Sequence, residues 1–376
     1  MLNKNIYLDF NATTPVHDLV LEKMIPFFSS NYGNASSIHY AGWQASEAIK
    51  IARENLAIAI EAEPAEIYFT SGATESINLA IRGVTEAYSS KGKHIVSFTT
   101  EHRAVLDTLS ALQLKGTEVT LLEVDGNGLP DLKQLEEAIR NDTVLVVGMF
   151  ANNETGVIFP IQQMVEIAHQ KGTLFFCDAT QAFGKIPVSA RDLNVDILAI
   201  SAHKVYGPKG VGAIYLKRKN PRVSIIPQLT GGGHEKGKRS GTLNVPGIVG
   251  LGECAILSPT FIEIYQNHLL TLRNYFETEI LKFKNIIINA EIANRLPNTT
   301  NFVVKNKKAD LLLASIPQLA CSTGSACSAA LPEPSHVLKA MGIKDEDAFA
   351  AIRISLGTTT TKEDIDLALE LFKSKL

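Results

Sequence analysis

A carboxylate and an amine stand at the ends of two apolar segments of the chain. Asp178 follows the segment 173–177, and Lys204, 26 positions after Asp178, follows the segment 196–200. A pyridoxal 5′-phosphate (PLP) enzyme needs such a pair, because a lysine forms the Schiff base and an acid keeps the pyridine nitrogen protonated. The pair therefore predicts PLP as the cofactor, and the residues that decide the reaction must lie elsewhere.

Small polar residues follow another apolar segment, which ends at Thr70. Residues 71–74 have the sequence Ser-Gly-Ala-Thr and open an expected helix. Backbone N–H groups near Ala73 and the Thr74 hydroxyl could approach a phosphate there, because the helix dipole favours an anion. The same four residues also make an ordinary helix cap, so both interpretations stay open.

A histidine and an asparagine follow two further apolar segments. His102 comes after the segment 94–98, where it would stack on a planar cofactor, transfer protons or cap a helix. Asn153 comes after the segment 143–150, where it would bond a ring oxygen or a substrate carboxylate, or belong to a turn. Ligands of open parallel sheets bind at the carboxyl ends of the strands, so these positions together predict one site.

Three more polar side chains lie beside the acid or the lysine in sequence. Gln181 follows Asp178 by three positions, and Ser201 and His203 lie just before Lys204. Each signal is modest alone, but their common place after strands strengthens the prediction of a cofactor site.

The cysteines divide into two groups. Cys327 lies among small polar residues, 321–329, which indicates an accessible loop with a reactive thiol. Cys177 and Cys254 lie in apolar surroundings and are expected to be buried and structural. Cys321 either pairs with Cys327 or ends the preceding strand, and we favour the strand. The spacing does not match structural zinc pairs, so no metal site is expected.

An arginine interrupts an apolar segment near the end of the chain. Arg353 lies in residues 351–355, Ala-Ile-Arg-Ile-Ser. A guanidinium in such a strand needs an anion, which would be a substrate carboxylate or an internal partner. The sequence leaves both alternatives open.

Apolar segments and helical patterns alternate from about residue 64 onward. This rhythm predicts an α/β fold with a mostly parallel sheet and helices on both faces. Strands are expected at 66–70, 94–98, 119–122, 143–150, 173–177, 196–200 and 212–216, and helices at 74–88, 103–115, 131–140 and 161–169.

The pattern changes beyond about residue 246. A long helical stretch, interrupted at 258–259, precedes shorter strands and a final helix over 363–373. We expect a smaller α+β domain built from 1–14 and 251–376, beside a large cofactor-binding domain over 15–250.

Composition excludes several classes of protein. The 376 residues are 45% hydrophobic and 20% charged, with a formal net charge of −3. This balance is globular, and it lacks the basic runs of a nucleic-acid-binding protein. No stretch approaches about 18 uninterrupted apolar residues, and the first residues have no apolar signal core, so neither a membrane span nor a leader is expected. Four cysteines do not form a secreted disulfide framework, which favours the cytoplasm.

The chain resembles the cysteine desulfurases of the nitrogen-fixation and iron–sulfur-cluster type, in the class V branch of fold-type I PLP enzymes. The resemblance runs from residue 6 to about 375. The matching segments are 8–15, 33–39, 69–76, 100–102, 152–156, 178–181, 201–204, 231–235, 239–242, 323–327 and Arg353. The chain stops at Leu376, where similar enzymes often continue into a segment that docks a scaffold protein.

The resemblance implies a role for each candidate residue. Lys204 would carry the cofactor, Asp178 would bind the pyridine nitrogen, His102 would stack on the ring and Gln181 would bond its phenolic oxygen. The phosphate would be held by Ala73, Thr74, Ser201 and His203, and by Thr242 from the other subunit of a homodimer. Asn153 and Arg353 would bind the carboxylate of L-cysteine.

The resemblance also implies the reaction. Lys204 would remove the α-proton, and the Cys327 thiolate, assisted by His102, would attack the substrate sulfur to leave a persulfide and release L-alanine. The sulfur would pass to acceptors for iron–sulfur cluster assembly or tRNA thiolation, with no direct nucleic-acid contact. One alternative is a selenocysteine lyase or a related class V aminotransferase or lyase, and Cys327 disfavours the aminotransferase, which has no use for it. Another is a non-catalytic relay subunit, which the presence of Lys204 and Asp178 disfavours.

Overall fold

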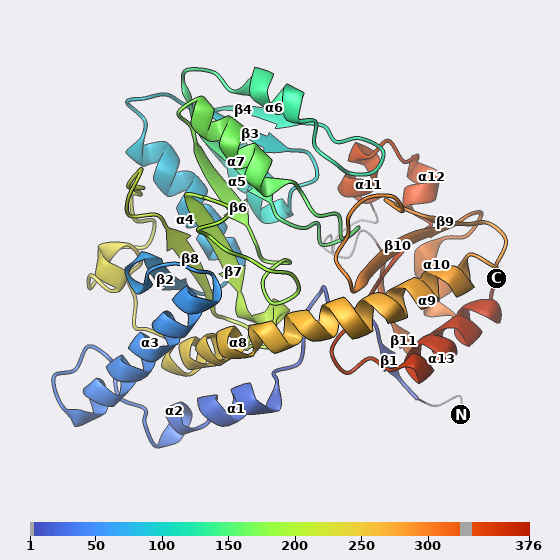
Figure 1. The fold of residues 1–376 in the computed structure, drawn as a ribbon, viewed down its shortest axis with the longest axis horizontal. Coiled ribbons are helices and arrows are strands. Elements are labelled where there is room, and N and C mark those ends of the chain that lie inside the picture. Colours follow the sequence, from blue (N-terminus) through green and yellow to red (C-terminus); the bar gives the residue numbers. More distant parts are fainter. Residues whose placement is uncertain (1–3, 324–332) are drawn as a thin grey trace.

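A seven-stranded sheet forms the centre of the larger half of the molecule (Figure 1). The structure is a computed structural model that describes residues 4–323 and 333–376. The strands lie in the order β2-β8-β7-β6-β5-β3-β4, and only β8 runs antiparallel to its neighbours. They are β2 (Ile67–Thr70), β3 (His94–Phe98), β4 (Glu118–Leu122), β5 (Thr143–Met149), β6 (Leu174–Asp178), β7 (Ile197–Ser201) and β8 (Gly212–Leu216). The predicted mostly parallel sheet is confirmed, with every expected strand end within one residue.

Helices cover both faces of this sheet, as predicted. The helices α4 (Ala73–Ala87) and α5 (Arg103–Gln113) bury their apolar sides in one core. The helices α6 (Leu132–Ala138) and α7 (Ile161–Gln170) pack into a second core on the opposite face. Strand β5 is buried along its whole length, as a central parallel strand must be.

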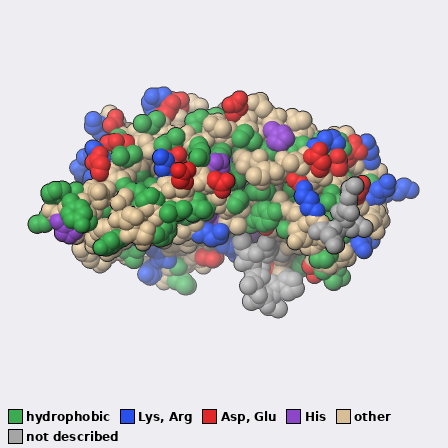
Figure 2. Space-filling model, turned by 90° about the horizontal axis from the view of Figure 1, so that it is seen from below, with side chains coloured by type: hydrophobic (Ala, Val, Ile, Leu, Met, Phe, Trp, Pro, Cys, Tyr) green, Lys and Arg blue, Asp and Glu red, His purple; other side chains and the backbone are tan. Residues whose placement is uncertain are grey.

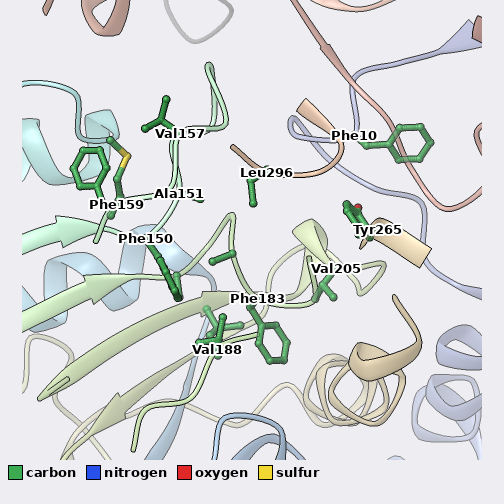
Figure 3. Packing of buried hydrophobic residues seen from close by; sticks show 14 of the residues in the cluster. Phe10, Phe150, Ala151, Val157, Phe159, Phe183, Val188, Val205, Tyr265 and Leu296 are labelled. Carbon is green, nitrogen blue, oxygen red and sulfur yellow. The ribbon is translucent and has the colours of Figure 1, made fainter. Parts of the chain in front are cut away.

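Apolar side chains also pack below the carboxyl edge of the sheet. Figure 3 shows Phe150 after β5, Phe183 after β6 and Val205 after β7, which belong to one buried cluster with Phe10 and Leu296 from distant parts of the chain. All five are at most 8% exposed. This packing gives the loops that follow the strands a rigid base, so that the polar residues on them are held in place.

A second, antiparallel sheet lies in the smaller half, in the order β12-β13-β10-β9. The N-terminal strand β1 instead pairs with β11, so the first residues of the chain lie beside the last third. The strands are β1 (Ile6–Tyr7), β9 (Ile286–Ile288), β10 (Thr299–Val304), β11 (Leu319–Ala320), β12 (Ser322–Thr323) and β13 (Ala351–Ser355). The helices here are α10 (Ala309–Ala314), α11 (His336–Ala340), α12 (Asp345–Ala348) and α13 (Lys362–Lys373). The domain limits 15–250 and 251–376 stay a prediction.

One long helix crosses from the larger half to the smaller (Figure 1). It comprises α8 (Val245–Ile264), a wider turn over Tyr265–Leu269 and α9 (Leu270–Ile280). The expected interruption at 258–259 is wrong, because α8 continues through Pro259. The helix is long and apolar enough to cross a membrane by length and composition alone. However, its apolar residues pack into the core, with Leu251 and Cys254 fully buried, which is typical of a core helix.

The N-terminal helices pack on one end of this long helix. They are α1 (Asp18–Met24), α2 (Pro26–Ser29) and α3 (Tyr40–Ala59). Where α3 crosses α8 the backbones nearly touch, since a Cβ on Gly252 would lie 2.6 Å from the Cα of Ala52. A glycine is therefore required at this crossing for steric reasons.

We expect Gly252→Ala to destabilise the protein by roughly 1–3 kcal/mol, because the added methyl group overpacks the α3–α8 crossing. Urea unfolding followed by circular dichroism measures the change. Glu263→Ala, at an exposed position of the same helix, is the matched control and should change stability by less than about 0.5 kcal/mol. Equal effects of the two substitutions would contradict the packing argument.

Candidate active site

A cavity of about 690 Å³ opens at the carboxyl ends of the parallel strands. Ten of the residues predicted from the sequence line it together. They are Ala73, Thr74, His102, Asn153, Asp178, Gln181, Ser201, His203, Lys204 and Arg353. Arg353 comes from β13 of the second sheet, so the cavity gathers residues that lie up to 280 positions apart in the chain.

Lys204 is held by the N-terminal segment of the chain. It ends a short turn, Ala202–Lys204, that directly follows β7. Its Nζ donates to the backbone oxygens of Asn11 and Ala12, each at 2.7 Å. These two carbonyl oxygens fix the amine at the cavity wall without a covalent link, so it is oriented in advance for reaction with a carbonyl ligand.

Asp178 is the last residue of β6 and is 5% exposed. Its Oδ1 accepts hydrogen bonds from the backbone N–H of Thr180, at 2.9 Å, and from the Thr180 hydroxyl. The carboxylate lies on the central part of the sheet, opposite Met149 and Ala199. These contacts through Oδ1 hold Asp178 in one orientation on the cavity wall.

His102 caps the N-terminus of α5. Its Nδ1 accepts from the backbone N–H of Ala104 at 3.1 Å, so in the neutral ring the proton lies on Nε2. Burial lowers the pKa of His102, while nearby Asp178 raises it and Lys204 lowers it further. The ring is therefore neutral near pH 7. The helix cap considered from the sequence is present, and His102 also lines the cavity, while its stacking on a cofactor and its proton transfer stay predictions.

The N-terminus of α4 forms one end of the cavity. Gly72 is the N-cap residue of α4 and has φ +148°. Because glycine has no side chain, it makes no capping hydrogen bond to the first backbone N–H groups of the helix. Gly212 of β8 lies directly behind, since a Cβ on it would come within 2.7 Å of the Cα of Gly72. Ser201 lines the same end. This end has the shape and donors to bind a phosphate group.

His203 lies at the same end of the cavity. Its Nδ1 is 3.2 Å from the hydroxyl of Thr13. Burial lowers the pKa of His203 to about 4, with further lowering by Lys204, Lys209 and Lys185. His203 is therefore neutral near pH 7 and acts by hydrogen bonding, while Lys209 supplies positive charge to this wall.

Arg353 forms the opposite end of the cavity. Its Nη2 donates to Asp9 Oδ1 at 2.6 Å and to Ser322 Oγ at 3.0 Å, and its Nη1 donates to the backbone oxygen of Asn153 at 3.0 Å. The internal ion pair considered from the sequence is therefore present. Because Arg353 also lines the cavity, an anionic ligand would share the guanidinium with Asp9.

Two predicted residues lie outside this cavity. Thr242 is exposed and belongs to the segment between β8 and α8. That segment is fastened to α3, because Glu235 binds Arg53 through two hydrogen bonds of 2.7 and 2.9 Å. Cys327, the predicted nucleophile, lies outside the described residues.

The other cysteines occupy structural positions. Cys177 and Cys254 are fully buried, and burial raises the pKa of both thiols, which confirms the structural interpretation. Cys321 is a free thiol between β11 and β12, and burial raises its pKa to about 12. The strand interpretation of Cys321 is thus favoured over a disulfide.

Sequence reasoning missed the wall formed by the N-terminal segment. Asp9, Asn11, Ala12 and Thr13 all line the cavity. Only their place in a matching segment drew attention to them, since they follow no strand of the large sheet. Lys185 was also missed, although it is 1% exposed and lies behind Gln181.

A buried glutamate closes the cavity on a further side. Glu154 is 7% exposed, and its Oε2 accepts from the Ser335 hydroxyl at 2.5 Å. Burial raises the pKa of Glu154 to about 7, against the opposing effects of Ser335, Arg353 and Arg103. The folded state therefore binds a proton at Glu154 more tightly than the unfolded state does.

Stability should therefore fall as the pH rises from the unfolded pKa through about 7, since folding must then bury a carboxylate. In Glu154→Gln this dependence disappears. We expect the stability of Glu154→Gln relative to the parent to increase by roughly 1–3 kcal/mol between about pH 5 and about pH 8. Urea unfolding at both pH values measures the difference, and parallel pH profiles for the two proteins would refute it.

Comparison with known proteins identifies the family of the chain. The model of the family "Aminotransferase class-V" matches residues 6–368. The cysteine desulfurase IscS of Neisseria meningitidis is 47% identical over 372 residues, which cover 99% of this chain and 92% of the relative.

Solved structures show the same similarity. A NifS-like protein superposes with a TM-score of 0.91 at 38% identity, covering 98% of both chains. SspA in complex with cysteine superposes with a TM-score of 0.84 at 36% identity, covering 95% of this chain and 100% of that one. On the extent of the family match and of these identities, the chain belongs to the aminotransferase class-V family.

Proposed function

We propose that this protein is a cysteine desulfurase that uses PLP to convert L-cysteine into L-alanine and protein-bound sulfur. The observation that carries the proposal is the single cavity in which Lys204 and Asp178 lie between a phosphate-binding end and Arg353. The names of the relatives, cysteine desulfurase IscS and SspA in complex with cysteine, support the same reaction and substrate.

The residues present fit PLP. The uncapped start of α4, with Thr74, Ser201 and His203, would hold the phosphate. Asp178 would bind the pyridine nitrogen, His102 would stack on the ring, Gln181 would bond the ring oxygen and Lys204 would form the Schiff base. When bound, PLP supplies an electron sink that stabilises negative charge on the substrate carbon.

The substrate would be oriented by its carboxylate. Arg353 would bind this group with the help of the Asn153 side chain, since both line the same end of the cavity. Released from the cofactor, the Lys204 amine would take the α-proton of the substrate. His102, neutral with its proton on Nε2, would exchange a proton with the reacting thiol groups.

Sulfur transfer would then take place at Cys327. Its thiolate attacks the substrate sulfur, an S–S bond forms and the carbon–sulfur bond breaks. The bonding electrons pass to the substrate carbon, which gains a proton to give L-alanine, while Cys327 keeps the sulfur as a persulfide. The persulfide would supply acceptor proteins for iron–sulfur cluster assembly or tRNA thiolation in the cytoplasm.

The test of this reaction uses two substitutions and one control. Cys327→Ala should lower alanine formation from L-cysteine by at least about 10³-fold while the visible absorbance of bound PLP persists. Lys204→Ala should lose both. Cys321→Ala, which removes a half-buried thiol whose pKa is raised, should keep its activity. Full desulfurase activity in Cys327→Ala would rule out the assignment.

The protein would act as a homodimer with the α1–α3 face at the interface. Figure 2 shows hydrophobic side chains gathered on the end of the molecule that carries these helices. They include Phe28, Tyr32, Ile38, Tyr40 and Trp43, which are 63–89% exposed. Monomeric proteins rarely leave so large an apolar surface open to water. Since Glu235 fastens the Thr242 segment to α3, the same contact would bring Thr242 to the phosphate site of the partner subunit.

We expect Trp43→Glu to convert the dimer into a monomer and to weaken PLP binding by about tenfold or more, because the partner's contribution to the phosphate site is lost. Analytical ultracentrifugation and PLP titration measure the two effects. Leu114→Glu changes an equally apolar residue that is 89% exposed on another element, and it should alter neither. A dimeric Trp43→Glu protein would contradict the proposed interface.

A further inference from the structure

Lys185 is a fully buried lysine in an unusual setting. It is 1% exposed, and its Nζ donates to Asn11 Oδ1 at 2.8 Å and to Gln181 Oε1 at 2.6 Å. No carboxylate of the described residues forms an ion pair with it. Buried lysines are rare without a charged partner, so two amide oxygens alone do not account for its presence.

Lys185 determines which way the Gln181 amide faces. The Lys185 Nζ donates to Gln181 Oε1, so the amide oxygen faces Lys185. The amide nitrogen is then turned away, where Nε2 donates to the backbone oxygen of Asn11 at 2.9 Å. Nε2 carries a second N–H, and Gln181 lines the cavity while Lys185 does not. The amide therefore offers a donor, and not an acceptor, to a ligand.

The same amine fixes the residue that holds Lys204. Asn11 Oδ1 accepts from Lys185, and its Nδ2 donates to Thr299 Oγ1 at 2.9 Å. The backbone oxygen of Asn11 receives both Gln181 Nε2 and Lys204 Nζ. The buried Lys185 amine thus orients both Gln181 and Lys204. These two side chains would contact neighbouring atoms of the cofactor.

The charge of Lys185 also bears on the cavity. Burial lowers the pKa of Lys185 well below its usual range, and Lys204 and Arg353 lower it further. A negatively charged ligand atom beside Gln181 would restore the attraction for a proton at Lys185. The phenolic oxygen of PLP is an atom of this kind.

We propose that Lys185 is a positioning residue that acts through Gln181 on the ring oxygen of the bound cofactor. This inference rests on the proposed PLP site. Lys185 touches neither substrate nor cofactor, but it makes Gln181 a hydrogen-bond donor, and when an anionic ring oxygen restores its proton it places a cation behind Gln181. Both effects stabilise negative charge on the ring oxygen and disfavour a proton shared between that oxygen and the Lys204 nitrogen.

The test follows the visible absorbance of the PLP-loaded protein during a pH titration. In Lys185→Met the midpoint pH of the absorbance change should rise by about one pH unit, because a cation and a hydrogen-bond donor are lost. Lys185→Gln keeps a donor without the charge, so its midpoint should rise by less. Asp178, His102, His203 and Arg353 surround the chromophore unchanged in both variants.

Two comparisons isolate the proposed path. Lys133→Met removes an exposed lysine and should leave the midpoint unchanged. Gln181→Met should raise the midpoint as Lys185→Met does, and adding Lys185→Met to it should produce no further shift. If Lys185→Met does not fold, the midpoint pH of Gln181→Met alone tests the effect of the Gln181 donor on the ring oxygen.

Three results would overturn the inference. The first is a midpoint in Lys185→Met equal to that of Lys133→Met. The second is a Lys185→Met shift of the same size with and without Gln181. The third is wild-type protein that shows no visible band with PLP, which contradicts the proposed cofactor as well and is thereby distinguished from the other two.

Discussion

The contact between the N-terminal segment and the large sheet is the interaction on which the site depends. The backbone oxygen of Asn11 accepts from both Lys204 and Gln181, which come from loops after β7 and β6. Asn11 is itself fixed by Lys185 and by Thr299 of β10, in the second sheet. These bonds come from backbone oxygens and amides, and they orient the Lys204 amine in the cavity. Removal of this segment would leave the lysine without its orientation.

The polar ends of the strands could be predicted from the sequence because their signals are local. An apolar segment followed by a polar residue is visible at Asp178 and at Lys204, and open parallel sheets gather such residues at one edge. Nine of the ten predicted residues that share the cavity reflect this rule, whereas Arg353 lies in β13 of the second sheet. The internal partner of Arg353 could be named only as an alternative, because Asp9 lies 344 positions away and no local pattern joins the two.

Features that depend on tertiary contacts could not be predicted. The helix continues through Pro259 although proline lacks the N–H of a helix interior, and residues before and after it, Ala255 and Phe261, are buried in the core. Lys185 looks like any surface lysine in the sequence, and only its burial sets it apart. Thr242 does not line the cavity of its own chain, so the role that the resemblance implies for it would require a second subunit.

The long helix through α8 and α9 has a mechanical consequence. One end of this helix packs on α3 and the other end packs against β10 and α13, so a single helix is part of both halves of the molecule. A rotation of one half relative to the other would have to bend this helix or disrupt its packing, and both cost free energy in a densely packed core. Ligand binding then requires little work to bring two lobes together, and more of the contact energy remains as affinity.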